Sequence, residues 1–112
     1  MTTATIAGVW RGRTRREIAD EYEQYLKAEG IPRLLQNALG VQLLREDLDT
    51  ETWFATTSYW PDIESMTAFT KGTPTKMHHL KGDGEYLIEL PEGIAIHTIL
   101  VDRHPSGRNE PN

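Results

Sequence analysis

Apolar and polar positions predict the same order of elements twice along this chain. In chain order these are a strand over residues 5–11, a helix from Thr14, a strand over 39–46, a strand over 53–60, a helix after Asp62 and a strand over 94–101. Two β-α-β halves in tandem are typical of the ferredoxin-like split βαβ arrangement. We therefore predict one α+β domain, residues 4–102, built on a four-stranded antiparallel sheet.

The first helix has a start signal, an apolar stripe and an end signal. Thr14 and Glu17 fit a capping box, in which the two side chains each satisfy an unpaired amide of the first turn. Apolar residues then fall at i, i+4, i+7 and i+8, and these are Ile18, Tyr22, Tyr25 and Leu26. Gly30 is expected to end the helix in the left-handed conformation, and Pro32 to start a short further turn. The stripe predicts that this helix lies on the sheet.

The second helix follows the same logic. Asp62 is the predicted N-cap, and Gly72 the predicted end. The predicted buried stripe consists of Ile63, Met66, Phe69 and Thr70. After Gly72, Thr73 and Pro74 are expected to open a short helix with Met77, His78, His79 and Leu80. Residues 47–51 have the composition of a turn between the two halves.

The third and fourth predicted strands have no charged side chain on either face. Residues 53–60 contain no charged side chain, and residues 94–100 follow suit. An antiparallel sheet with one wet face alternates apolar and charged residues, and two helical segments can cover only one face. We therefore predict a homodimer in which two sheets pack face to face. The alternative is a monomer with an apolar outer face.

The amino-acid composition limits the classes of binding partner that we expect. The 112 residues are 38% hydrophobic and 26% charged, which suits one small core. Twelve Lys plus Arg against 17 Asp plus Glu give a net charge of -5, which disfavours nucleic acid and membrane surfaces as partners. Cysteine is absent, and neither an export signal nor a spanning segment is seen, so a cytoplasmic location is expected. Residues 103–112 are polar, contain Pro and Gly, and are expected to form a flexible tail.

A family resemblance rests on the order of elements and on local sequence. A strand ending Ser58-Tyr59-Trp60 leads into a helix with the sequence Asp-Ile-Glu-Ser-Met-Thr-Ala-Phe over 62–69, and a segment with histidines follows. Over residues 5–101 this resembles the antibiotic biosynthesis monooxygenase superfamily of dimeric α/β barrels. The superfamily includes cofactor-free oxygenases of quinols and aromatic polyketides, heme-degrading enzymes and members with no assigned activity.

The heme-degrading branch of that superfamily uses an Asn on the first strand, a Trp on the helix after the third strand, and a His further along. Counting without gaps from Trp60, the His position falls on His79 and the Trp position on Phe69. The first strand has no Asn. The resemblance therefore disfavours heme degradation, and no bound cofactor is expected.

His78 and His79 are the candidate catalytic residues. An imidazole that titrates near neutrality can take a proton from a phenol or hydroquinone, and the resulting anion can react with oxygen without a metal or flavin. Helical geometry does not choose between the two, and the family spacing favours His79. The alternative is a pair of partly exposed surface histidines.

The other candidate site residues form walls for a flat ligand. The aromatic set comprises Trp10, Tyr22, Tyr25, Trp53, Tyr59, Trp60 and Phe69. Trp10, Tyr22 and Phe69 are the predicted pocket walls, although aromatics at such spacings also simply form a core. Trp60 can instead close its strand and seat the next helix. His97 points either into the core or into the dimer interface, and a hydrogen-bonded structural role is the simpler interpretation.

The sequence gives weaker support for a metal site and for an anion site. The potential metal ligands have no established spacing, and these are His78, His79, Asp83, Glu85 and His97. Four arginines crowd the predicted first helix start, and these are Arg11, Arg13, Arg15 and Arg16. They could attract a carboxylate or phosphate, but solvated arginines paired with nearby acids such as Glu17 or Asp20 are the simpler interpretation.

The leading functional hypothesis is a cofactor-independent monooxygenase that acts on a small aromatic or quinol-type substrate, with His79 as general base. A different class, a non-catalytic dimeric protein that binds a small ligand or responds to stress, remains open because no motif demands turnover. A heme-binding protein, with His79 or His78 as axial ligand, comes third.

Overall fold

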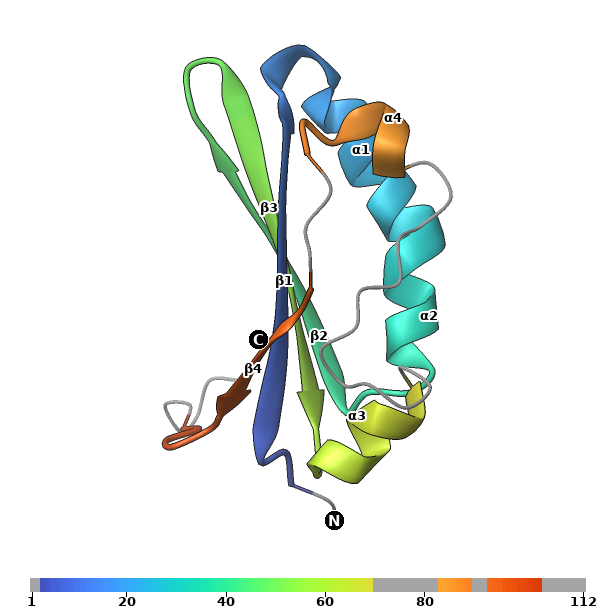
Figure 1. Cartoon of the computed structure of the whole chain (residues 1–112), viewed down its shortest axis with the longest axis vertical. Coiled ribbons are helices and arrows are strands. Elements are labelled where there is room, and N and C mark those ends of the chain that lie inside the picture. Colours follow the sequence, from blue (N-terminus) through green and yellow to red (C-terminus); the bar gives the residue numbers. More distant parts are fainter. Residues whose placement is uncertain (1–2, 70–82, 90–92, 104–112) are drawn as a thin grey trace, which may run out of the picture.

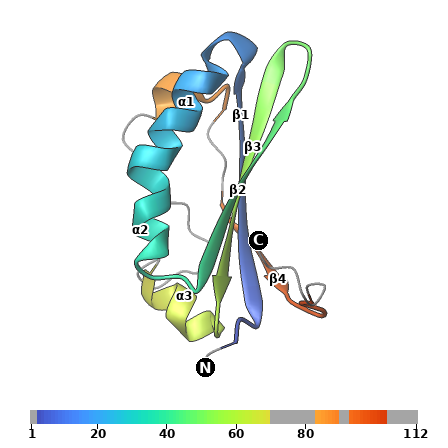
Figure 2. The same cartoon turned by 180° about the vertical axis from the view of Figure 1, so that it is seen from behind.

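The computed structural model describes residues 3–69, 83–89 and 93–103. In chain order the elements are β1 (Ile6–Arg15), a 3₁₀ turn (Arg16–Ile18), α1 (Ala19–Tyr25), a π-helical turn (Leu26–Gly30), α2 (Ile31–Leu35), β2 (Gly40–Asp47), β3 (Glu51–Trp60), α3 (Ile63–Phe69), α4 (Asp83–Tyr86) and β4 (Ala95–Thr98). The strands form one antiparallel sheet in the order β2-β3-β1-β4. Figure 1 and Figure 2 show the helices on one face of this sheet. The predicted ferredoxin-like α+β fold is confirmed.

The sheet has a helix face and an open face, and register assigns each side chain to one of them. β1 pairs with β3 along its whole length, from Ile6 opposite Trp60 to Arg15 opposite Glu51. Directly paired residues lie on the same face, and the face alternates along a strand. Because Trp10 is buried against α1, even-numbered residues of β1 and β3 lie on the helix face. Odd-numbered residues of both strands lie on the open face.

The first helix begins later than predicted. Thr14 lies in β1 opposite Thr52, and its hydroxyl donates to the Arg15 carbonyl at 3.0 Å. Helical turns start at Arg16, and Arg15 before them is extended. The predicted capping box of Thr14 and Glu17 is therefore wrong. A side-chain cap contributes about 1 kcal/mol, whereas extending β1 through Arg15 prolongs its pairing with β3 as far as Glu51.

The helix also continues through the predicted stop at Gly30. Gly30 is right-handed, with φ -91° and ψ -49°, so its predicted left-handed conformation is wrong. The Ile31 amide donates to the Leu26 carbonyl, five residues back, which makes a wider π turn. Pro32 has no amide hydrogen to donate, and it lies in the first turn of α2, where none is needed. The short turn predicted at Pro32 is thus present as part of one continuous helical stretch.

Two other local predictions are confirmed. The Ser65 amide donates to Asp62 Oδ1 at 2.8 Å, so Asp62 caps α3, and this bond holds the pKa of the Asp62 carboxyl below its usual value. The Leu48 amide donates to the Glu51 carbonyl at 2.8 Å, which closes the predicted turn between β2 and β3. Of the buried stripe predicted on α3, Met66 is buried, but Ile63 is 37% exposed, so its predicted burial is wrong.

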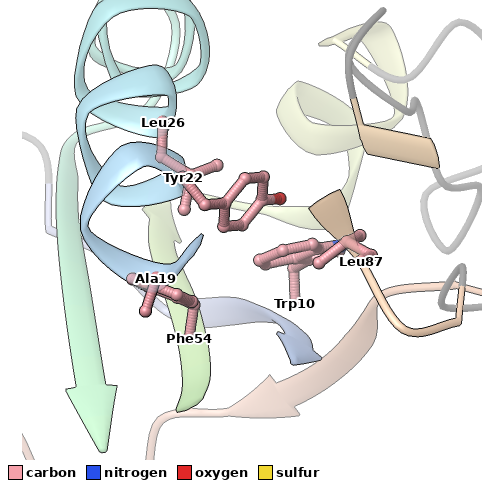
Figure 3. Close-up of a cluster of buried hydrophobic side chains, with 6 residues drawn as sticks. All are labelled: Trp10, Ala19, Tyr22, Leu26, Phe54 and Leu87. Atoms are coloured by element: carbon pink, nitrogen blue, oxygen red, sulfur yellow. The ribbon is translucent and has the colours of Figure 1, made fainter. Parts of the chain in front are cut away.

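The core lies between the sheet and the first helix (Figure 3). It consists of Trp10, Ala19, Tyr22, Leu26, Phe54 and Leu87. Tyr22 is fully buried and meets the Phe54 ring edge-on, with centroids 5.3 Å apart. Burial of each large side chain contributes about 1.5–3 kcal/mol. Of the four residues in the predicted stripe, Tyr22 and Leu26 are buried, whereas Ile18 and Tyr25 are half-buried.

Within the described ranges, no helix has the length and apolar character needed to cross a bilayer. The second predicted short helix, residues 73–80, lies outside the described residues. So does the predicted tail from His104 onward.

Candidate functional site

Trp10 is the centre of the candidate site. It lies midway along β1 on the helix face, and only 7% of it is exposed. A Cβ atom on Gly12 would stand 2.8 Å from Trp10 Cη2 and 3.1 Å from Leu87 Cδ2. Glycine at this position therefore makes room for the indole to lie along its own strand beneath Leu87.

The indole nitrogen of Trp10 is buried, and no group of the described residues accepts a hydrogen bond from it. The indole of Trp60 makes a sharp contrast, because its Nε1 donates to Ser58 Oγ at 2.9 Å. A buried donor without a partner costs about 1–3 kcal/mol, and native proteins leave few of them. Trp10 is therefore the side chain of this core with unused hydrogen-bonding capacity.

Three tyrosines lie near Trp10, one within the core and two packed against it. Tyr22 lies 6.1 Å from Tyr25 and 5.3 Å from Tyr86, measured between ring centroids, and Tyr25 and Tyr86 are 5.4 Å apart. The Tyr86 hydroxyl donates to Glu21 Oε2 at 2.8 Å, and this bond raises the pKa of the Tyr86 phenol. Tyr86 thus ties α4 to α1. Sequence reasoning missed it, because a four-residue helix shows no periodicity.

Leu87 completes the cover over Trp10. It follows α4 and forms a bridge with Thr14, and the next amide, of Ile88, donates to the Arg13 carbonyl at 2.9 Å. The edge of β1 therefore holds this segment directly. Leu87 and Phe54 were absent from the predicted site because their contacts arise only from the tertiary fold.

Trp60 and Phe69 form a separate cluster. Their ring centroids are 5.3 Å apart, and Arg33 lies 5.4 Å from the centre of the Phe69 ring. Trp60 is four positions along β3 from the residue paired with Trp10, a distance of roughly 13 Å at the usual rise of a strand. The structure therefore brings Trp10 and Tyr22 together and leaves Trp60 and Phe69 at the α3 end of the sheet.

The histidines divide between the open face and the part of the chain that is not described. His97 pairs with Ala7 on β4, which places it on the open face, where it is exposed. Of the two positions considered for His97, the core is thus not the one it takes. His78 and His79 lie outside the described residues. Within the described residues, no group of three metal-ligating side chains converges.

The arginines near the start of the chain are largely occupied by local partners. Arg13 Nη1 contacts both carboxylate oxygens of Glu51, at 2.9 and 3.1 Å, and this raises the pKa of the Arg13 guanidinium. Arg11 and Arg13 lie 4.8 and 5.6 Å from the centre of the Trp53 ring on the open face. Arg16 Nη1 donates to the Leu48 carbonyl at 2.8 Å. The four arginines therefore do not form one anion site.

An open depression of about 810 Å³ lies beside these arginines, at the tip of the β2–β3 hairpin. Its lining contains two arginines and three acids, together with Thr50 and Ile88, and the charged members are Arg15, Arg16, Glu17, Asp49 and Glu51. The two signs of charge offset one another, so this surface has no clear preference for an anion.

The open face has an apolar centre. No helix of the described residues covers it, and it presents Val9, Leu44, Ala55 and Tyr59. Leu44 is 53% exposed. Beyond β4, Leu100 and Val101 are 88% and 77% exposed, on a segment that both views show directed away from the helices.

Comparison with known proteins gives a structural match and no sequence match. No family model and no curated protein matches the chain. The structure is similar to the crystal structure of a proposed antibiotic biosynthesis monooxygenase from Bacillus cereus, with a TM-score of 0.65 and 10% sequence identity over 92% of this chain and 100% of that one. The chain therefore has the fold of that monooxygenase, as the sequence resemblance predicted.

Proposed function

We propose that this protein is a cofactor-independent monooxygenase for a small aromatic or quinol-type substrate, and that the substrate binds on the helix face beside Trp10. The observation that carries the proposal is the buried, unpartnered indole nitrogen of Trp10 within a cluster of aromatic rings. The shared fold supports it. Flat apolar rings are the natural occupants of such surroundings.

The chemistry needs a base, a dry pocket and oxygen. A base removes a proton from a phenolic substrate, and the electron-rich anion then reduces O₂. Where a ring CH₂ becomes C=O, one oxygen atom enters the product and the other leaves as water, so the substrate supplies all four electrons. We assign the base to His79, with His78 as the alternative, on the family spacing. Tyr22 and Leu87 would shield the anion from water.

Oxygen uptake tests this function. With a panel of anthrones and hydroquinones, we expect consumption of O₂ that falls about 100-fold or more in His79→Ala. His104→Ala, in the predicted tail, is the matched control and should keep the wild-type rate. Tight binding of the panel without O₂ uptake would instead identify a non-catalytic ligand-binding protein. Hemin should produce no Soret shift that depends on His78 or His79.

We also propose that two copies of the chain pack through their open faces. The apolar centre of that face and the exposed Leu100 and Val101 support this, because a lone protomer leaves them in water. Packing of two sheets, about 10 Å apart, would bury these side chains.

A further inference from the structure

Two tryptophans lie buried on the same face of the sheet, and the indole N–H of only one of them donates a hydrogen bond within the described residues. Trp60 Nε1 donates to Ser58 Oγ, two residues away on β3, and Ser58 lies opposite Gly8. Trp10 Nε1 has an accessible surface close to zero and no acceptor among the described residues. Since buried indole N–H groups nearly always find a partner, the Trp10 donor calls for an acceptor from beyond the described residues, and a bound ligand can supply one.

The place of the donor limits what that acceptor can be. Figure 3 shows the Trp10 nitrogen on the side of the ring that faces Leu87, with the Tyr22 ring above the indole. The Gly12 backbone closes the strand side, because even a Cβ there would touch Trp10 Cζ2 at 2.9 Å. The near neighbours are aromatic or aliphatic. A fully charged carboxylate or phosphate would lose its hydration here and gain one neutral donor, which is a poor exchange.

The cover over the donor is short and is tied at defined points. Ile88 N–H donates to the Arg13 carbonyl, and the Tyr86 hydroxyl donates to Glu21. These two bonds hold Leu87 across the indole, and the aliphatic Leu87 side chain cannot accept the Trp10 hydrogen. An occupant must therefore enter beside the rings and bring its own oxygen.

We propose that Trp10 Nε1–H is a specificity-determining donor that binds a ring carbonyl or phenolic oxygen of a flat ligand. The site then selects quinone-like and phenol-like molecules over hydrocarbons of the same shape. This inference rests on the proposed function for the location of the ligand, but it concerns binding and requires no turnover. Sites that hydrogen-bond a substrate oxygen discriminate strongly against analogues that lack it.

The test compares two probes of one shape, 1,4-naphthoquinone and naphthalene, on the whole protein. The chain contains three tryptophans, so a ¹H–¹⁵N spectrum shows three indole cross-peaks. Trp10→Phe identifies one of them, and Trp53→Phe, on the open face, identifies another. We expect naphthoquinone to shift the resonance of the Trp10 indole proton downfield. Naphthalene should cause no such downfield shift.

Affinity gives the second readout. We expect naphthoquinone to bind wild-type protein about 10-fold more tightly than naphthalene, the effect of one buried hydrogen bond. Trp10→Phe should lose this preference, so that the two probes bind it with equal affinity, and Trp53→Phe should retain it. If Trp10→Phe does not fold, the wild-type titration decides, with the cross-peak assigned through its nuclear Overhauser effect to Leu87.

Three results would overturn the inference. They are a Trp10 cross-peak that naphthoquinone leaves in place, equal affinity for the two probes, and a preference that survives Trp10→Phe. The proposed function fails separately. If naphthoquinone shifts the Trp10 cross-peak but the anthrone panel gives no O₂ uptake, Trp10 is a ligand donor and the protein is not an oxygenase. If O₂ is consumed and Trp10→Phe has an unchanged KM, the protein is an oxygenase and Trp10 is not a donor to the substrate.

Discussion

At the residue scale, the contrast between Trp10 and Trp60 shows what sequence can and cannot reveal. Both were candidate pocket residues, and both are buried on the helix face. Ser58 lies two positions before Trp60, and residues at i and i+2 share a face of a strand, so that hydrogen bond could be read from sequence. The unsatisfied state of Trp10 could not, because it depends on α1 and the segment around Leu87, which are distant in sequence.

This contrast predicts different stabilities for two equivalent substitutions. Trp60→Phe removes a hydrogen bond to Ser58, whereas Trp10→Phe removes a donor that has no partner in the free protein. We expect the free energy of unfolding to fall about 1 kcal/mol further for Trp60→Phe than for Trp10→Phe. Urea denaturation of the two variants measures the difference. Equal losses would mean that the Trp10 donor is already satisfied.

A second prediction concerns Gly12. The added methyl of Gly12→Ala would stand 2.8 Å from Trp10 Cη2, so the indole or β1 must move. We expect a loss of about 1–3 kcal/mol in the free energy of unfolding and a changed near-ultraviolet circular dichroism spectrum. Gly40→Ala is the matched control, because its nearest neighbour, Tyr59 Cδ2, lies at 3.5 Å. Similar spectra for the two variants would contradict this packing of Trp10.

At the scale of elements, local sequence signals were reliable where hydrogen bonds form between residues close in sequence. They were unreliable where a residue pairs instead with a strand distant in sequence. The Asp62 cap and the turn at residues 47–51 depend on neighbours in sequence, and both were predicted correctly. The capping box at Thr14 failed because β3 recruits that residue into the sheet. Gly30 failed as a stop because it stays right-handed, and a π turn leads into Pro32, which lies in the first turn of α2.

Arg45 of β2 links that strand to α1 through ion pairs. Arg45 Nη1 donates to Asp20 at 2.8 Å and to Glu23 at 2.7 Å, both on α1, and its Nε donates to Asp47 at 2.9 Å. The pKa of Glu23 lies below its usual value because of hydrogen bonds from Lys27 and then Arg45. The pKa of Asp47 is lowered by the Thr52 hydroxyl and then by Arg45.

These lowered pKa values predict how stability varies with acid. A carboxyl with a lowered folded-state pKa stabilises the fold above its ordinary pKa, and this contribution is lost as pH falls through the folded-state value. Arg45→Met should therefore cost about 1 kcal/mol at pH 7, and it should lose less further stability than wild type on acidification to about pH 3. Urea midpoints at the two pH values measure both effects. Parallel acid curves would show that Arg45 does not influence these carboxyls.

At the scale of the whole molecule, the order of elements and the sheet were predictable because the pattern repeats. The position of the site within the fold was less so. His97 illustrates the reason, because one residue of register decides whether a strand side chain points to the core or away from it, and β4 places it on the open face. The absence of charge on residues 53–60 did not extend to the whole open face, because Trp53 there lies beside Arg11 and Arg13 of β1.

The proposed dimer gives the prediction that belongs to this scale. Leu44→Lys places a charge on the open face, and we expect it to convert a dimer of wild-type protein to a monomer in sedimentation velocity. Leu35→Lys is the matched control, since Leu35 is 58% exposed on α2, on the opposite side of the sheet. It should remain dimeric. A wild-type chain that sediments with the mass of a single protomer at micromolar concentration would reject the dimer.

The pleat of β1 has a consequence for how this protein can change. Trp10 points to one side and its neighbours Val9 and Arg11 to the other, with strands paired on both edges. Inserting one amino acid just before Trp10 would exchange the two faces for the rest of this strand. The indole would then point to the open face, and Arg11 would point into the hydrophobic core. Natural variants and engineered chimeras should therefore tolerate exchanges of side chains in β1 far more readily than any alteration of its length.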